Sequence, residues 1–221
     1  MKLGIDVGST TTTAAYFDGN TARMIEINAS GATMLPSVVT IADGQVYIGQ
    51  EAIEKGRQFP DYMFRHFKRR VGERWNDAED TGYQTCAGPG GMLHFRGPDS
   101  AIYSPVEFYS YLIGAIIDAA NAYLAPHDTV TGAVLCVPAD FTPLQIEAVN
   151  EAARLAGLTD FSLISAQNAA GNWVKVVQRV PVRIQLDSAA EQPPLRAGLS
   201  AMVTVRTGQR RQLLGLAWPR Q

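Results

Sequence analysis

The chain has 221 residues, of which 46% are apolar and 18% charged, and its formal net charge is −2. This length supports one sizeable domain, or one domain with an appended segment, and the near-neutral charge argues against nucleic acid or an anionic membrane as a partner. The N-terminal sequence is not a signal peptide and no stretch is apolar enough to span a membrane, so we expect a cytoplasmic protein.

Two cysteines and three histidines offer little for a metal or disulfide site. Cys86 and Cys136 are too few for a disulfide framework, and Cys136 lies in an apolar run that predicts a small core residue. His66, His94 and His127 have no metal-ligand spacing around them, so we expect them at the surface or in loops.

The net charge differs sharply between the first 165 residues and the rest of the chain. Residues 1–165 carry 11 basic and 19 acidic side chains, a net charge of −8, whereas residues 166–221 carry 8 basic and 2 acidic side chains, a net charge of +6. A change of this size suggests separate origins or separate partners. We therefore expect two parts, 1–165 and 166–221.

The first part opens with segments in which apolar and polar residues alternate. Residues 2–7, 11–17 and 22–27 are predicted to form an antiparallel meander with a glycine turn after the first strand. A hairpin is expected over residues 38–48, because Asp43-Gly44 is a strong turn dipeptide.

The middle of the first part is less regular. A short helix is expected over residues 51–57, followed by a basic helical or extended segment over 64–71. Residues 75–103 are rich in Gly, Asp and Pro, which predicts an irregular insertion.

Two helices with clear start signals follow. Ser104 is a good N-cap and is followed by Pro and by Glu107, which predicts a helix to about residue 124. Thr142-Pro143 predicts a second helix, which ends at Gly157.

The two helices alternate with strands. A buried strand is expected over residues 129–137 and a short strand over 161–164. The order β-β-β-α-β-α-β is the one expected of a ribonuclease-H-like α/β unit. Beyond Ser165 the alternating stretches 173–177, 182–187 and 201–206 predict a β-rich tail of two or three strands.

The first turn carries the sharpest motif, which reads Gly-Ile-Asp-Val-Gly-Ser-Thr-Thr over residues 4–11. An aspartate at the end of a buried strand, here Asp6, is costly unless it holds a cation or accepts hydrogen bonds. Glycine at position 8 lets the backbone approach a phosphate closely. Amides and hydroxyls that can donate to phosphate oxygens then follow at Ser9, Thr10 and Thr11. Taken alone, the stretch also fits an ordinary hairpin with Asp near its turn.

Three further stretches appear in a fixed order after this motif. They are Lys-Arg-Arg-Val-Gly at residues 68–72, Thr-Gly-Ala-Val-Leu-Cys-Val-Pro-Ala-Asp-Phe at 131–141, and Ala-Ala-Arg-Leu-Ala-Gly-Leu at 152–158. Together with the first motif they resemble the nucleotide-binding domain of the seventy-kilodalton heat-shock chaperone (DnaK-like) family, over residues 1 to about 165. Without the other motifs, the basic residues 68–70 would be interpreted as a solvated surface.

The resemblance implies lobe I of an actin-like ATPase, half of a domain that holds ATP and Mg²⁺ between two lobes. It places Asp6 near the Mg²⁺, through water, and gives the turn of Gly8, Ser9 and Thr10 to the β- and γ-phosphates. It matches Lys68 with the catalytic lysine, whose ammonium stabilises charge on the transferring phosphoryl group. The partners it implies are the nucleotide, protein clients and co-chaperones.

The sequence departs from this family at residue 166. Ala166 stands where the family has a glutamate that helps the metal and the attacking water, and the second phosphate loop and the adenosine loop are absent from these 221 residues. We therefore expect a truncated lobe with an incomplete site, weak nucleotide binding and little or no hydrolysis.

The tail has a resemblance of its own. Residues 171–184 and 194–200 resemble the end of an EmrA/HlyD-type membrane fusion protein, a periplasmic adaptor of efflux pumps. This resemblance implies a small β-barrel that binds a transporter protein. The alternative interpretation of the tail is a generic basic hairpin.

Two alternative readings of the whole chain follow. One is a non-enzymatic adaptor fragment, which would need export. The other is an activator of acyl-CoA dehydratases, which shares the Gly-Ile-Asp-x-Gly-Ser-Thr-Thr-Thr opening. Those activators need an iron–sulfur cluster between two subunits, and the sequence has no suitable cysteine pair.

Overall fold

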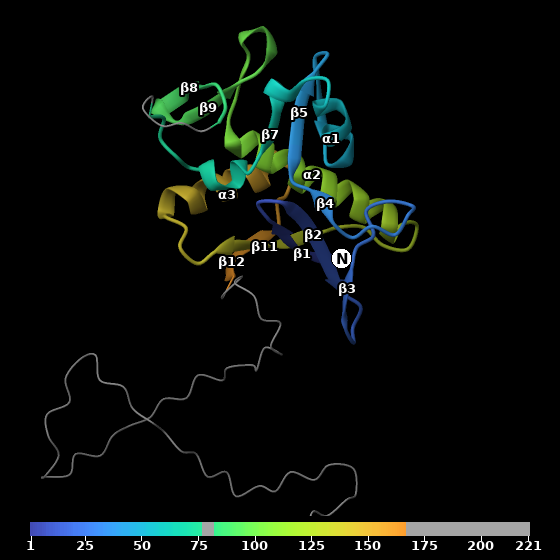
Figure 1. Ribbon diagram of the computed structural model, residues 1–221. Helices are drawn as coiled ribbons and strands as arrows, with labels where there is room; N and C mark the ends of the chain where they lie inside the picture. Colours follow the sequence, from blue (N-terminus) through green and yellow to red (C-terminus); the bar gives the residue numbers. More distant parts are fainter. Residues whose placement is uncertain (77–81, 167–221) are drawn as a thin grey trace, which may run out of the picture. The chain divides into compact units, whose positions relative to one another are not determined.

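The computed structural model describes residues 1–76 and 82–166, which form one compact unit (Figure 1). The predicted strands of the basic tail lie outside these residues. Within the described ranges, no helix combines the length and apolarity needed to cross a bilayer.

One mixed sheet forms the base of the lobe. Its first strand pairs antiparallel with the second and parallel with the strand at 132–138, which in turn pairs parallel with the last strand. The strand order is β12-β11-β1-β2-β3, and a short β4 pairs with β2. The strands are β1 (Lys2–Val7), β2 (Thr11–Phe17), β3 (Ala22–Met24), β4 (Leu35–Pro36), β11 (Gly132–Pro138) and β12 (Phe161–Ala166). This topology confirms the ribonuclease-H-like half domain predicted from the sequence.

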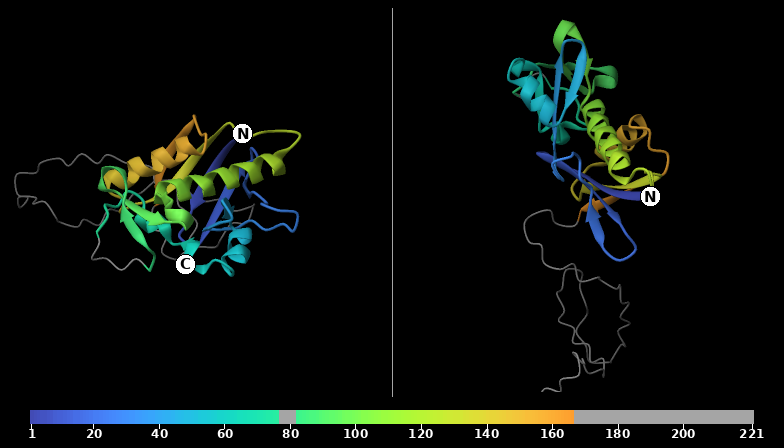
Figure 2. Two further views of the ribbon diagram at one scale, coloured as in Figure 1. Left: turned by 90° about the horizontal axis from the view of Figure 1, so that it is seen from above. Right: turned by 90° about the vertical axis from the view of Figure 1, so that its right-hand side faces the viewer.

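Helices α2 (Pro105–Leu124) and α3 (Pro143–Leu155) lie together on one face of this sheet (Figure 2). Both begin at the N-cap residues that their sequences predicted, and the structure shows a capping box at each. The Ser104 hydroxyl accepts from the Glu107 amide at 3.1 Å, and the Glu107 carboxylate accepts from the Ser104 amide at 2.6 Å. Thr142 and Gln145 repeat the arrangement in α3. Local chemistry thus fixes where each helix begins.

The core lies between the sheet and the helices. Leu3, Ile5 and Val7 alternate along β1 with exposed neighbours and are buried. They join α2 side chains in one hydrophobic cluster, which includes Phe108, Leu112, Ile113 and Ile116. Because strand side chains alternate between faces, Asp6 must lie on the opposite face, away from the helices.

A second small sheet holds the predicted hairpin, with the strand order β6-β5-β7. Its turn residues Asp43 and Gly44 both have positive φ, at 52° and 71°, as a tight hairpin turn requires. The elements of this region are β5 (Val38–Ala42), β6 (Gln45–Ile48), α1 (Gln50–Gly56), the 3-10 helix η1 (Pro60–Tyr62) and β7 (Met63–Arg65). The basic segment predicted over 64–71 is therefore extended at first and then turns into the 3-10 helix η2 (Phe67–Arg70).

The prediction of an irregular insertion over residues 75–103 was wrong in its described part. A three-stranded sheet with the order β10-β9-β8 forms there, and the glycines and prolines occupy its turns. Phe95 holds it in place, because its ring lies 5.2 Å from Phe64 and 5.5 Å from Phe108. The elements are β8 (Thr85–Ala87), η3 (Pro89–Gly91), β9 (Leu93–Arg96), η4 (Pro98–Ser100) and β10 (Ile102–Tyr103).

Candidate functional site

The turn between β1 and β2 is closed tightly by its own backbone. The amide of Gly8 donates to the carbonyl of Thr11 at 3.0 Å. A Cβ atom on residue 8 would lie 2.4 Å from that same carbonyl oxygen, a distance that real side chains do not tolerate. The turn therefore needs glycine for the close approach of two backbone segments.

A second segment holds the turn from outside. The amide of Ser37 donates to the carbonyl of Thr10 at 2.8 Å, and the hydroxyls of Ser37 and Thr12 are 3.0 Å apart in a buried contact. Sequence reasoning missed Ser37 and Thr12, because nothing local to residues 37 and 12 signals that they meet. Their contact ties the turn to the residue that precedes β5.

The amides of this turn remain available to a ligand. Within the described residues, the N–H groups of Ser9 and Thr10 have no protein acceptor. Successive free amides beside a glycine form a concave group of donors that suits an anion such as a phosphate. Of the predicted residues, Ser9 and Thr10 thus present free amides, whereas the Gly8 amide and the Thr11 carbonyl bind each other in closing the turn.

Asp6 faces the open side of the sheet. It pairs in register with Cys136 on β11 and with Thr13 on β2, so the three side chains share one face. The Asp6 side chain is 59% exposed. Cys136 is only half-buried beside it, so the prediction of a core cysteine was wrong. The apolar run around Cys136 did not reveal which of its residues face away from the helices.

Lys68 approaches Asp6 from η2. The neighbouring Phe67 is buried and anchors the 3-10 turn, and the Lys68 side chain is only 11% exposed. Its Nζ lies 3.9 Å from Oδ1 of Asp6, which is an electrostatic contact longer than a hydrogen bond. Burial lowers the pKa of Lys68, and the charge of Asp6 opposes that shift. The structure thus brings together the predicted lysine, aspartate and glycine turn.

Tyr109 lies beneath this site on α2. Its residue is fully buried, and within the described residues its hydroxyl has no hydrogen-bond partner. Burial raises the pKa of Tyr109, with smaller contributions from Asp6 and Cys136. This buried hydroxyl could not be predicted from the sequence, because its position depends on how α2 packs under the sheet.

The residues at this edge fit Mg²⁺ held together with a phosphate. Mg²⁺ keeps several waters and is usually bound by one or two carboxylates plus substrate phosphates. Asp6 supplies one exposed carboxylate. Among the described residues, no group of three His, Cys, Asp or Glu side chains forms a self-sufficient metal site. The donor set therefore suits a metal that arrives with its ligand.

The carboxyl ends of β1, β11 and β12 meet at the same edge of the sheet. Asp6 pairs with Cys136, and Pro138 pairs with Ala166 two strands away from β1. Ligands of α/β folds bind at such an edge. At the end of β12 this edge carries an alanine, Ala166, and therefore no charged side chain at that position.

The Hsp70 protein family model matches residues 2–171. The chain belongs to the Hsp70 family. An Hsp70-type lobe thus accounts for the order of the strands and helices.

Curated Hsp70 relatives agree with this assignment. The chaperone protein DnaK of Thermus thermophilus is 30% identical over 172 residues, which cover 76% of this chain and 27% of the relative. The HscA homolog of Bordetella petrii is 32% identical over 194 residues, which cover 86% of this chain and 29% of the relative. The chain therefore spans less than a third of the length of these Hsp70 proteins.

A second family model, the AAEA-like beta-barrel domain, matches residues 144–206. It overlaps the Hsp70 match over residues 144–171. In the described part of that overlap, α3 and β12 belong to the Hsp70-type lobe, because β12 pairs with β11 and the α3 residues Val149, Ala152 and Ala153 are buried in its core. The remaining match falls on the basic tail, in agreement with the membrane fusion protein resemblance.

Proposed function

We propose that this lobe binds a nucleoside triphosphate with Mg²⁺ weakly, and hydrolyses it little or not at all. The observation that carries the proposal is the position of the Lys68 ammonium, 3.9 Å from Asp6 and beside the glycine turn. A cation, a carboxylate and free backbone donors at one sheet edge are the groups that recognise a metal-bound phosphate chain.

Each residue has a distinct part in the proposal. Gly8 closes the turn, the free amides of Ser9 and Thr10 donate to the β- and γ-phosphate oxygens, and Asp6 orients water on the Mg²⁺. Lys68 stabilises negative charge on the terminal phosphate, and its partial burial strengthens that interaction. The metal supplies charge neutralisation when it is bound with the nucleotide.

Weak binding follows from how little of the nucleotide these residues can contact. Phosphoryl transfer depends on many groups positioned together around the γ-phosphate. Ala166 stands at the sheet edge in place of an acid, so one of these groups is missing. A nucleotide held by this lobe alone would remain largely in water.

The test is a titration of the ¹⁵N-labelled chain with ATP, with and without Mg²⁺. We expect the amide resonances of Gly8, Ser9 and Thr10 to shift, and the shifts to diminish without the metal. Shifts spread over exposed basic residues instead of this turn would overturn the proposal.

Partners and location are proposed on the same basis. The names of the relatives, chaperone protein DnaK and the HscA homolog, support protein clients and co-chaperones as partners. We place the lobe in the cytoplasm, since its two cysteines are unpaired thiols. The proposed boundary between lobe and tail lies at residues 165 and 166.

A second candidate function is a non-enzymatic adaptor whose tail binds a transporter protein. The AAEA-like beta-barrel match over residues 144–206 favours it, and it would place that part of the chain in the periplasm. Protease protection of the tagged chain in spheroplasts distinguishes the two. Digestion from the periplasmic side supports the adaptor, and protection supports the cytoplasmic lobe.

A further inference from the structure

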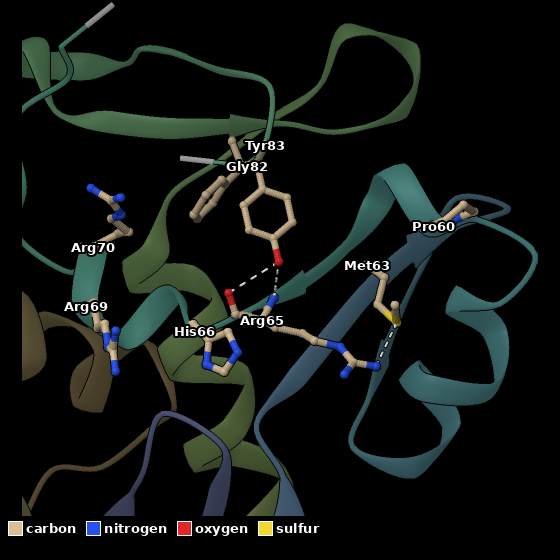
Figure 3. Close-up of a pocket in the computed structure, with 9 residues that line it drawn as sticks. Pro60, Met63, Arg65, His66, Arg69, Arg70, Gly82 and Tyr83 are labelled. Carbon is tan, nitrogen blue, oxygen red and sulfur yellow. Dashed lines mark hydrogen bonds between the residues drawn. The ribbon is translucent and has the colours of Figure 1, made fainter. Parts of the chain in front are cut away.

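A hollow of about 480 Å³ lies on the lobe between β7, η2 and the start of the β8–β10 sheet (Figure 3). We call it the basic pocket. None of its lining residues belongs to the β1–β2 turn, and Lys68 does not line it. The residues on which the argument rests are three nitrogen-bearing side chains and three apolar or aromatic ones, namely Arg65, His66, Arg69, Met63, Tyr83 and Phe95.

Arg69 brings to the basic pocket a positive charge that is available to a ligand. Its side chain is exposed and, in the described part of the chain, it forms no ion pair. The next arginine differs, because Nη1 of Arg70 lies 3.1 Å from both carboxylate oxygens of Glu73. The cation offered to a ligand here is therefore Arg69.

Arg65 adds a second guanidinium whose donors are poorly satisfied. Its Nη2 has the Met63 sulfur at 3.5 Å as acceptor, which is a weak partner. Its Nε is buried and, within the described residues, has no acceptor. An unmet buried donor is unfavourable, so a hydrogen-bond acceptor that reaches this Nε would be stabilised.

The backbone beneath Arg65 is held firmly. Its amide donates to the Tyr83 hydroxyl at 2.9 Å, and that hydroxyl donates back to the Arg65 carbonyl at 3.4 Å (Figure 3). This clamp joins β7 to the chain just before β8. In Figure 3 the His66 imidazole is drawn between the side chains of Arg65 and Arg69.

The rest of the pocket wall is apolar. The rings of Tyr83 and Phe95 meet edge to face with centroids 5.5 Å apart, and Phe95 is buried. Such a wall suits a flat hydrocarbon body. The volume falls in the range of small-molecule sites and far exceeds that of a bare inorganic ion.

We propose that the basic pocket binds a small organic anion in which an aromatic ring carries a carboxylate or phosphate group. The exposed guanidinium of Arg69 binds the oxyanion, since guanidinium matches these groups in charge and geometry. The aromatic wall packs against the ring. This site is separate from the proposed nucleotide site and needs no Mg²⁺.

The experiment uses the full ¹⁵N-labelled chain and phenyl phosphate as the probe, without Mg²⁺. We expect shifts at the amides of Arg65, His66, Arg69 and Tyr83. Binding should be at least tenfold tighter than that of inorganic phosphate, which lacks the ring, and of phenol, which lacks the charge. Phenylacetate in place of phenyl phosphate tells whether a carboxylate or a phosphate is preferred.

Variants make the assignment specific. Arg69→Ala should weaken phenyl phosphate binding at least tenfold. Arg154→Ala, an equal change in charge at an exposed site on α3, should leave it unchanged, and so should Asp6→Ala. Shifts centred on Gly8 to Thr10, equal binding of inorganic phosphate, or full binding by Arg69→Ala would overturn the proposal.

Discussion

The ammonium of Lys68 lies 3.9 Å from the carboxylate of Asp6, although one residue sits in a 3-10 turn and the other at the end of the first strand. Lys68 is largely covered while Asp6 is mostly exposed. The contact is therefore a buried cation that faces an accessible anion at the edge of the sheet. A ligand that brings its own metal and phosphates can bind both.

The burial of Lys68 predicts a specific dependence of stability on pH. Burial lowers the pKa of Lys68, so the folded state disfavours the charged form and binds fewer protons than the unfolded state between the two pKa values. The free energy of unfolding should therefore rise, relative to Lys68→Met, as pH increases toward about 10.4. Urea denaturation of both proteins at pH 7.5 and 10 measures it. A difference in unfolding free energy between the original protein and Lys68→Met that is the same at both pH values would contradict the account.

Gly8→Ala should destabilise the lobe by about 1–3 kcal/mol, because the added methyl group meets the Thr11 carbonyl at 2.4 Å and strains the turn. Gly114→Ala is the matched control. Its Cβ would meet nothing within 4 Å, and glycine inside a helix costs about 0.5–1 kcal/mol relative to alanine, so this change should stabilise. Chemical denaturation measures the free energy of unfolding of both variants. Equal changes in the two variants would argue against the tight turn.

Tyr109→Phe should raise the free energy of unfolding by about 1 kcal/mol. The substitution removes a buried hydroxyl that has no partner within the described residues, and such a group costs about 1–3 kcal/mol. Thermal and urea unfolding measure the change. Tyr123→Phe, at an exposed position, should stay within about 0.5 kcal/mol of the original protein. A destabilised Tyr109→Phe would mean that its hydroxyl has a partner after all, such as a bound water.

Ala166→Glu should not restore hydrolysis. Residue 166 lies at the end of β12, at the sheet edge that carries Asp6 two strands away. One carboxylate in an open, wet half-site supplies little of the positioning that phosphoryl transfer needs. A steady-state phosphate-release assay should stay below about one turnover per minute, far under the ordinary range of about 1–1,000 per second. Faster turnover would show that the lobe holds more of the catalytic machinery than proposed.

The elements that sequence predicted best are those whose signals are local. Ser104 and Glu107 predict the start of α2 without knowledge of any tertiary contact. Asp43-Gly44 predicts its hairpin in the same way. The strands after Trp75 carry no such signal. Of these, β8, β9 and β10 are two to four residues long and persist because Phe95 packs on α2, which only the folded chain shows.

The site was predictable in part for the same reason. Asp6 and its glycine turn form a contiguous motif, whereas the sequence alone suggested a solvated basic surface for Lys68. Its burial depends on the anchoring of Phe67 in the core. The side of the sheet on which Cys136 lies could not be predicted from an unbroken apolar run, because such a run lacks the alternation that distinguishes the two faces.

Calorimetric titration of the full chain with ATP and Mg²⁺ tests the central claim most directly. ATP has about 31 non-hydrogen atoms, and about 0.3 kcal/mol per atom gives about 9 kcal/mol for a complete site. About half of those contacts leave a dissociation constant near millimolar. The account predicts this weak affinity, its loss in Asp6→Ala and without Mg²⁺, and its retention in Asp160→Ala, a carboxylate of similar exposure. Micromolar binding, or binding that is unchanged in Asp6→Ala, would contradict it.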